Sequence, residues 1–251
     1  MDPVSLIGLV LGIGALVATQ FIEGGHPMTL VQAPAALIVF VGTLGATLLS
    51  CSSRQLAAAL HESRAVFGPI VDRKRRIAEL FRDLAFIARK DGLVALDRMG
   101  PSLPSLFMRR ALRYVIDGCE EKQLEDILDA DIRSRMKLSL SAAEAFEIAG
   151  GYAPTMGILG AVLGLIRAME SLTEPDALGA GIAVAFVATI YGVGLANLVL
   201  LPIASKIRDR ARLREEEDTI VAEGALGLQS GISPRSLERL LLAHVTRESG
   251  S

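Results

Sequence analysis

The chain has 251 residues, a length that fits one large domain or two. Its formal net charge of −2 says little by itself, and we expect no nucleic acid partner. Half of it is apolar (51%) and its mean hydropathy is +0.44, although aromatic residues make up only 4%. The excess lies in four uncharged runs, and four such helices in water would leave too much apolar surface exposed. The composition therefore excludes a water-soluble protein and indicates an integral membrane protein.

Each uncharged run is long enough to cross a bilayer as a helix, which takes about 17–25 residues. The first run could also be a signal peptide, but no basic segment precedes it, and Glu23–His26 follows without a small-x-small cleavage site. We interpret it as a retained span. In chain order the predicted spans are Pro3–Ile22, Pro27–Ser53, Ile148–Ile166 and Ala177–Ser205.

The long segment between the second and third runs is predicted to be a helical domain. Apolar residues recur in it every three or four positions, which is the period of an amphipathic helix. No alternation typical of a strand extends beyond a few residues. The predicted helices are 73–91 with a stop at Gly92, 104–117 with a stop at Gly118, and 121–136.

Helix-forming sequence continues beyond this domain. Between Lys137 and Ile166 only two glycines and Pro154 interrupt it, so the third span is expected to begin as a helix before it enters the membrane. The fourth span likewise continues through Pro202 into charged sequence. Two short apolar stretches follow it, at 220–228 and 236–245.

Basic residues indicate the side of the membrane on which each connection lies. Of the 26 Lys and Arg residues, 17 lie in 54–137 and 8 in 206–247, whereas the short connections near 23–28 and 168–178 hold none. Because cytoplasmic loops carry the excess of Lys and Arg, we expect both termini and the long segment to be cytoplasmic. The predicted organisation is all-α: two spans with a short periplasmic turn (1–53), a helical cytoplasmic domain (54–147), two more spans (148–205) and a cytoplasmic tail (206–251).

The sequence lacks the motifs of an enzyme. None of its three histidines is paired with a Ser, Cys or carboxylate in a nucleophile arrangement, and it has no metal-ligand spacing, P-loop or dinucleotide fingerprint. We therefore expect no enzymatic activity, no metal and no cofactor. The glycines of the first run, and Gly160 with Gly164 in the third, match the small-xxx-small pattern that lets membrane helices pack closely.

The four runs contain few polar groups, and none of these ionises near neutral pH. Burying a carboxylate in the membrane costs free energy, so such a group is retained mainly for function. The four runs contain no carboxylate. If protons or cations cross, the titrating group must come from another chain. Pro154 and Pro202 each free a backbone carbonyl, as a static bend for packing or as a hinge or vestibule where water meets an ion path. The main polar residues are Gln32, Thr43, Thr47, Thr155, Thr189, Tyr191 and Asn197.

Seven segments carry a more specific pattern. The opening SLIGLVLGIGAL is followed by FIEGGH and APAALIVFVGTLGATLL. Later come ARKDGLVALD at 88–97, GGYAPTMGILGAVLGLI at 150–166, GIAVAFVATIYGVGLANLVLLPIASK at 181–206 and VAEGALGLQSGISPRSLERLL at 221–241. In this order they resemble, over nearly the whole chain, the A subunit family of flagellar motor stators (MotA, PomA and MotC), with the MotC-like branch as the closest.

The resemblance implies an ion-driven rotary machine in the bacterial inner membrane. A subunits of that family form a ring, expected to be a pentamer, around a pair of MotB-like single-span B subunits that carry the essential membrane aspartate. The ring contacts membrane lipid and a FliG-like rotor switch protein. The positions that match the family's ion path are Pro154, Ala161, Thr189 and Pro202, and those that match its rotor-facing charges are Arg89, Lys90 and Asp97, the last where glutamate is usual.

The resemblance also bears on the ion. Sodium-driven members resemble GTLVGL where this chain has GAVLGL at 160–165, and a threonine hydroxyl there could help to coordinate Na⁺. Ala161 offers no oxygen, which favours protons. Two alternatives stay open: an ExbB/TolQ-type energiser, which usually has three spans, and a passive membrane channel or scaffold.

Overall fold

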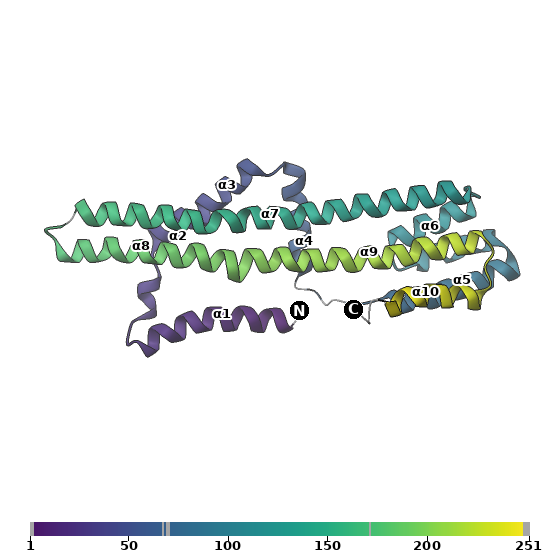
Figure 1. The fold of residues 1–251 in the computed structure, drawn as a ribbon, viewed down its shortest axis with the longest axis horizontal. Coiled ribbons are helices and arrows are strands. Elements are labelled where there is room, and N and C mark those ends of the chain that lie inside the picture. The colour runs from purple at the N-terminus through teal and green to yellow at the C-terminus, as the bar shows by residue number, and fades with distance from the viewer. Residues whose placement is uncertain (1–2, 67, 69–70, 171, 248–251) are drawn as a thin grey trace. The chain divides into compact units, whose positions relative to one another are not determined.

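The computed structural model describes residues 3–66, 68, 71–170 and 172–247, and every regular element in them is helical. The chain folds into two compact units that are each built from two separate segments. Unit 1 comprises Met1–Pro69 and Leu138–Asp209, and unit 2 comprises Ile70–Lys137 and Arg210–Ser251. Figure 1 shows the helices as a ribbon coloured from purple at the N-terminus to yellow at the C-terminus.

Unit 1 contains the apolar helices. Three of its helical stretches are long and apolar enough to cross a membrane, Pro27–Ser50 and parts of Glu121–Glu170 and Pro175–Gln229, and Ile7–Ile22 is a shorter apolar helix. The membrane character is thereby confirmed, whereas the count of four spans stays a prediction. The elements of this part are α1 (Pro3–Ile22), η1 (Pro27–Leu30), α2 (Ala33–Ala36), η2 (Leu37–Val41), α3 (Gly42–Ser50), α4 (Ser53–Val66), α8 (Pro175–Leu195), η4 (Ala196–Leu200), the part of α7 (Glu121–Glu170) from Leu138 onward and the part of α9 (Leu201–Gln229) up to Asp209.

Unit 2 has an apolar core formed by amphipathic helices. The ring of Phe81 on α5 (Lys74–Asp91) lies against Gly224 of α9, where a Cβ would come within 2.6 Å of it. Phe107 of α6 (Leu106–Ile116), Leu128 of α7 and Leu237 of α10 (Pro234–Arg247) are buried in the same cluster. Helices α5 and α10 lie side by side in Figure 1. The packing therefore joins helices that are distant in the sequence.

The first two predicted helices of this unit are confirmed, together with their stops. Helix α5 ends at Asp91, and Gly92 follows with φ of +84°, a conformation that a side chain disfavours. Helix α6 ends before Gly118, which has φ of +72°. At its start the Ser105 hydroxyl accepts the Met108 N–H at 3.1 Å, a standard N-cap.

Two features differ from the sequence interpretation. The stretch predicted as a helix at 121–136 does not end there, because α7 continues without interruption to Glu170. Residues Leu93–Ser102, for which no element was predicted, form a 3₁₀ helix (η3) that buries Leu96. The predicted domain boundaries at 54, 148 and 206 mark where the chain enters or leaves the membrane, whereas the two units are defined by how compactly their residues pack. The predicted boundaries therefore stay a prediction.

Candidate functional site

Helices α7 and α8 make direct backbone contact in unit 1. A Cβ placed on Gly192 would lie 2.5 Å from the carbonyl oxygen of Ala153. One placed on Gly164 would lie 2.7 Å from the backbone nitrogen of Ala185. Real Cβ atoms are essentially never found below 3.0 Å, so only glycine fits at these positions.

The contact continues along both helices. Gly160 faces Ala188, and Gly181 faces Ala168, in each case without room for a further methyl group. The predicted close packing at Gly160 and Gly164 is thereby confirmed. In the first run the interpretation holds only in part: Gly12 lies against the Leu198 side chain, but nothing described lies within 4 Å of a Cβ at Gly8 or Gly14.

Three of the four residues predicted to line an ion path lie together on this helix pair. Pro154 and Ala161 are seven residues apart on α7, which is two turns and places them on one face. Between them lies Gly157, whose ideal Cβ is 3.4 Å from the Cα of Thr189 on α8. The Thr189 side chain is exposed, and its hydroxyl donates to the Ala185 carbonyl at 3.3 Å.

Pro202 lies apart from the other three. It follows Thr189 by 13 residues (202 − 189), which is about 20 Å of helix at 1.5 Å per residue. It is the second residue after η4, a turn with π-helical hydrogen bonding. A proline ring clashes with the carbonyl four residues earlier, here that of Leu198 inside η4, and the wider turn relieves that clash. By contrast, α7 stays helical through Pro154.

The neighbouring face of α7, about 100° round the helix from Pro154, carries a hydroxyl that the sequence did not single out for the path. Thr155 is exposed, and its hydroxyl donates to the Tyr152 carbonyl at 2.8 Å. Its neighbours Ile158, Leu159 and Val162 are exposed and apolar. The surface thus offers hydroxyl and carbonyl oxygens but no carboxylate, amine or imidazole. It can line a path for an ion, yet it cannot take up a proton.

Hydrogen bonds join the second apolar helix, Pro27–Ser50, to α7 and α8. The Tyr191 hydroxyl donates to the Leu30 carbonyl and accepts the Gln32 N–H at 3.3 Å. The hydroxyls of Ser50 and Tyr152 are 2.7 Å apart. Such bonds stabilise membrane helix packing because water cannot compete for them. Sequence pattern alone could not pair these residues, because their partners are more than 100 positions away.

An ion pair marks the charged end of the apolar segments. Arg208 of α9 donates from Nη2 to Glu147 Oε2 of α7 at 2.6 Å, and its Nη1 pairs with the other carboxylate oxygen. Both side chains are partly exposed, 43% for Arg208 and 31% for Glu147, so the pair contributes only about 1 kcal/mol. The planar, two-point contact fixes geometry more than it adds stability.

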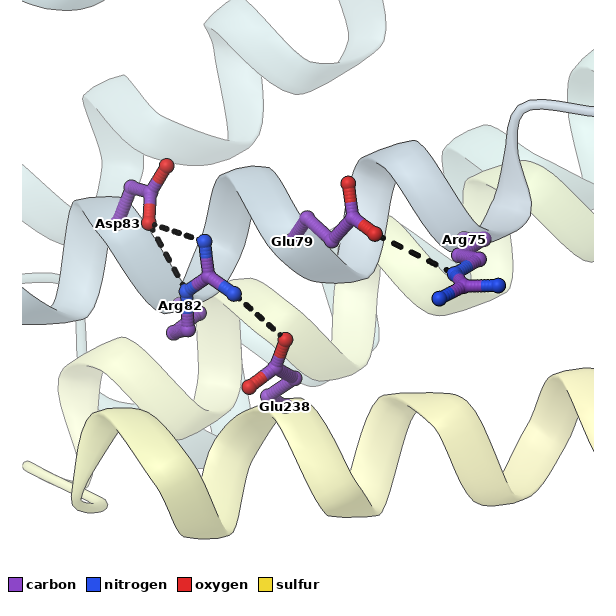
Figure 2. A network of polar contacts seen from close by, with 5 residues as sticks. All are labelled: Arg75, Glu79, Arg82, Asp83 and Glu238. Atoms are coloured by element: carbon purple, nitrogen blue, oxygen red, sulfur yellow. Dashed lines mark hydrogen bonds and ion pairs between the residues drawn. The ribbon is translucent and has the colours of Figure 1, made fainter.

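The predicted rotor-facing charges lie on the surface of unit 2. Figure 2 shows that earlier cations of α5 are engaged within the unit: Arg75 pairs with Glu79, and Arg82 bridges Asp83 and Glu238 of α10. Arg89, Lys90 and Asp97 are exposed. Among the described residues they take part in no ion pair, which leaves their charges available to a partner.

A buried acid lies in the core of unit 2. Asp218 of α9 is 8% exposed and accepts a hydrogen bond from Arg135 Nη1 at 2.7 Å. The Arg135 guanidinium also lies over the Phe107 ring, 5.3 Å from its centre. Burial raises the pKa of Asp218 to about 6, since the loss of water outweighs the attraction of Arg135, and the charges of Glu217 and Asp131 add to the increase.

This pKa predicts that unit 2 is more stable in mild acid. The unfolded carboxyl has a pKa of 3.8, so between about pH 4 and 6 the folded chain binds a proton that the unfolded chain releases. The stabilisation is present near pH 4 and is lost as pH rises through 6, with an upper limit of about 3 kcal/mol. We expect a higher urea midpoint at pH 5.5 than at 7.5, followed by helical circular dichroism of the chain in detergent.

The variant Asp218→Asn should make the urea midpoint less dependent on pH. Burial also raises the pKa of Glu217 and of Glu223, so part of the dependence will persist. Exposed Asp97, replaced by asparagine, serves as the control and should leave the difference between pH 5.5 and 7.5 unchanged. An equal difference in wild type and Asp218→Asn would contradict the assignment.

The sequence of the chain matches a known class of membrane protein. The sequence model of the MotA/TolQ/ExbB proton channel family matches residues 101–248, more than half of the chain. The chain is therefore a member of this family, which consists of proton channel subunits rather than enzymes, as predicted.

Within that family the chain is homologous to the flagellar motor stator proteins MotA and PomA. It is 32% identical to motility protein A of Helicobacter pylori over 98% of this chain and 95% of the relative. It is 29% identical to the chemotaxis protein PomA of Vibrio alginolyticus, over 96% and 94%. The MotC-like branch is not confirmed.

Solved structures agree with the sequence comparison. The structure of C. jejuni MotAB superposes with a TM-score of 0.90 at 30% identity, over 97% of this chain and 96% of that one. The flagellar MotAB stator complex of Bacillus subtilis gives a TM-score of 0.89 at 28% identity, over 99% and 98%. The predicted all-helical membrane fold is thereby confirmed.

Proposed function

We propose that this chain is the A subunit of a bacterial flagellar stator in which proton flow drives the rotor. One observation carries the proposal: the exposed face of α7 and α8 is built like the wall of an ion path, but the four apolar runs hold no Asp, Glu, Lys, Arg or His. A wall without an acid needs a second polypeptide to move protons.

That second polypeptide is a MotB-like single-span B subunit with an aspartate in its span. The matched structures are MotAB complexes, which supports an assembly of this kind. We propose a pentameric ring of A subunits around the B subunits, with the exposed apolar side chains facing either lipid or neighbouring copies. Pro154, Ala161, Thr189 and Pro202 line the path in this arrangement.

The proposed complex lies in the inner membrane with both termini of this chain in the cytoplasm. The positive-inside distribution supports this orientation, because the basic residues gather in the segments of unit 2 and at the adjoining helix ends. Unit 2 then presents Arg89, Lys90 and Asp97 to a FliG-like rotor protein.

The ExbB/TolQ alternative shares the family model, which alone does not separate the two. The motility proteins align over nearly their full length, and this supports the stator. A passive scaffold is distinguished by its lack of proton flow, a test developed in the Discussion.

Proton use predicts swimming without sodium. Ala161 supplies no hydroxyl at the position that matches a threonine in the sequence pattern of sodium-driven members. Na⁺ needs several oxygen ligands. We expect the chain, expressed with its B subunit in a host lacking its own stators, to restore swimming in sodium-free medium. A proton uncoupler should stop that swimming. Restored motility that depends on added sodium would overturn the choice of ion.

Charge reversal at Arg89 is expected to weaken swimming without abolishing it. Exposed ion pairs contribute about 0–1 kcal/mol each, so no single contact with the rotor is decisive. A compensating reversal on the rotor protein should restore part of the swimming speed. Arg113, an exposed cation in the last turn of α6, is the matched control, and Arg113→Glu should have a smaller effect. Unchanged swimming with Arg89 and Asp97 both reversed would count against this surface.

A further inference from the structure

An asparagine interrupts the exposed, mostly apolar strip of α8 and η4. The exposed side chains of Thr189, Val193 and Asn197 follow one another at every fourth residue, and residues at this spacing are neighbours on a helix surface. Asn197 lies eight residues after Thr189 and five before Pro202, which is about 12 and 8 Å of helix at 1.5 Å per residue. It therefore lies between two residues of the proposed path that are otherwise far apart.

The Asn197 amide is only partly satisfied. Its Nδ2 donates one hydrogen bond, to the Val193 carbonyl at 3.0 Å. An amide has two N–H donors and a carbonyl acceptor, so one N–H and the side-chain oxygen have no partner in the part of the chain that the structure describes. Lipid tails offer no hydrogen bonds, and an amide left unbonded among them costs free energy. Lipid alone is therefore not what covers this strip.

The backbone beside Asn197 adds an acceptor. Asn197 belongs to η4, where the Leu201 N–H bonds to the Ala196 carbonyl five residues earlier. Pro202 comes next and has no N–H, so at this point the helix has one carbonyl acceptor more than it has N–H donors. In a membrane such a carbonyl is tolerated where a neighbouring helix or water bonds to it. The amide and the backbone thus require both a donor and an acceptor close together.

We propose that Asn197 and the η4 backbone bind water in the cytoplasmic half of the ion path, and that this water carries protons from the B subunit past Pro202. Water both donates and accepts hydrogen bonds, and a bound water needs about two to four polar partners, which the amide and the backbone carbonyl supply. Each water accepts one proton and passes another on, so no side chain of this chain changes its charge. Asn197 is a positioning residue for the proposed proton flow, on which the inference rests.

A side chain of a neighbouring polypeptide is the competing partner. The backbone groups of a membrane helix are bonded internally, so such a helix could satisfy Asn197 only with a polar side chain. That single contact would leave the extra backbone acceptor to be satisfied separately. Water meets both requirements at once, and the strip is continuous with Thr189, which the proposed function places on the path. The observations therefore favour water over a dry contact.

Chemical labelling tests whether water reaches this strip. A water-soluble methanethiosulfonate reagent reacts with the thiolate, which forms in water and not in lipid. Asn197→Cys, in a chain without its two native cysteines and assembled with the B subunit in vesicles, should be labelled at least tenfold faster than Leu48→Cys. Leu48 is the matched control because it is exposed on the second apolar helix. It lies five residues from Ser53, whereas Asn197 lies eight from Ser205, so depth alone would favour labelling of Leu48→Cys.

Two results of the labelling would overturn the proposal. Equal rates at the two positions would show that the strip has no special access to water. Absence of labelling at Asn197→Cys would identify a dry contact with another polypeptide. Val193→Cys, on the same strip, should also be labelled faster than Leu48→Cys, and it decides the question if Asn197→Cys does not assemble.

Proton uptake tests whether this water matters. Asn197→Leu keeps about the size of the side chain and removes its hydrogen bonds. In vesicles that hold the complex with the B subunit, we expect uptake to fall about tenfold, the effect of one lost hydrogen bond, with the amount of complex in size-exclusion chromatography unchanged. Asn197→Gln retains the amide and should keep at least half of the rate. Thr19→Val is the matched control, because Thr19 is exposed on α1 and its hydroxyl makes the same kind of bond, to the Ala15 carbonyl at 2.9 Å.

Unchanged uptake in Asn197→Leu, or equal losses in Asn197→Leu and Thr19→Val, would refute the role of Asn197. Loss of the assembled complex in Asn197→Leu would identify a contact between subunits instead, and would refute it too. Labelling needs no proton flow, so the two proposals can fail separately. A complex that is labelled at Asn197→Cys but whose unaltered form carries no protons would refute the stator function and leave the water site, and proton flow past an unlabelled strip would do the reverse.

Discussion

Replacing Gly192 with alanine is expected to reduce the assembled complex about tenfold or more and to abolish swimming. The new Cβ would lie 2.5 Å from the Ala153 carbonyl oxygen and 3.0 Å from the Gly157 Cα, and both are backbone atoms that no rotamer change can move. Overpacking of this kind costs about 1–3 kcal/mol, and a cost in this range accounts for the expected decrease in the amount of assembled complex. Helices α7 and α8 must separate to make room.

The matched control is Gly194→Ala, two residues further along. Nothing described lies within 4 Å of a Cβ at Gly194, and alanine favours the helix more than glycine does, so assembly should be unchanged. Size-exclusion chromatography of the purified complex and swimming speed measure the two effects. If both variants assemble equally well, the close packing of this helix pair is wrong.

The second large effect concerns proton flow. We expect vesicles that contain this chain alone to take up protons no faster than empty vesicles after a potential is imposed. The four apolar runs contain no Asp, Glu, Lys, Arg or His, and hydroxyls such as that of Thr189 do not ionise at neutral pH. Each proton that does cross yields about 2.3 kcal/mol per 100 mV, so flow without nucleotide can drive rotation.

Addition of the B subunit should start the flow, and its aspartate should be required. A B subunit in which that aspartate is replaced by asparagine keeps the shape of the complex and removes the acid, which makes it the matched control. A pH-sensitive dye inside the vesicles reports the rate. Uptake by the chain alone, or unchanged uptake with the asparagine form, would refute the division of labour proposed above.

Much of this architecture could be predicted from local patterns. The uncharged runs identified the apolar helices, and the three- to four-residue period together with Gly92 and Gly118 identified α5 and α6 with their ends. Local sequence patterns suffice here because the spacing of apolar residues in a helix, and the backbone conformation of the glycine that follows it, involve only a few neighbouring residues. The glycine pair Gly160 and Gly164 likewise predicted close packing.

The remaining features depend on partners distant in the sequence. Nothing local pairs Glu147 with Arg208, or the Tyr191 hydroxyl with the Leu30 carbonyl. The π turn at Ala196–Leu200 also shifts the helical phase, so a regular 3.6-residue period could not place Pro202 relative to Thr189. The roles of the predicted path and rotor residues stay predictions, because both require a second protein.

The two-segment construction of unit 2 has a consequence for biosynthesis. Its core needs Ile220 and Leu237 against Phe81 and Phe107, yet the ribosome makes α9 and α10 last. Helices α5 and α6 must therefore wait, with apolar surface uncovered, while the later apolar helices are inserted. A chaperone that shields nascent chains is expected to engage residues 70–137 during this interval and to release them once translation finishes.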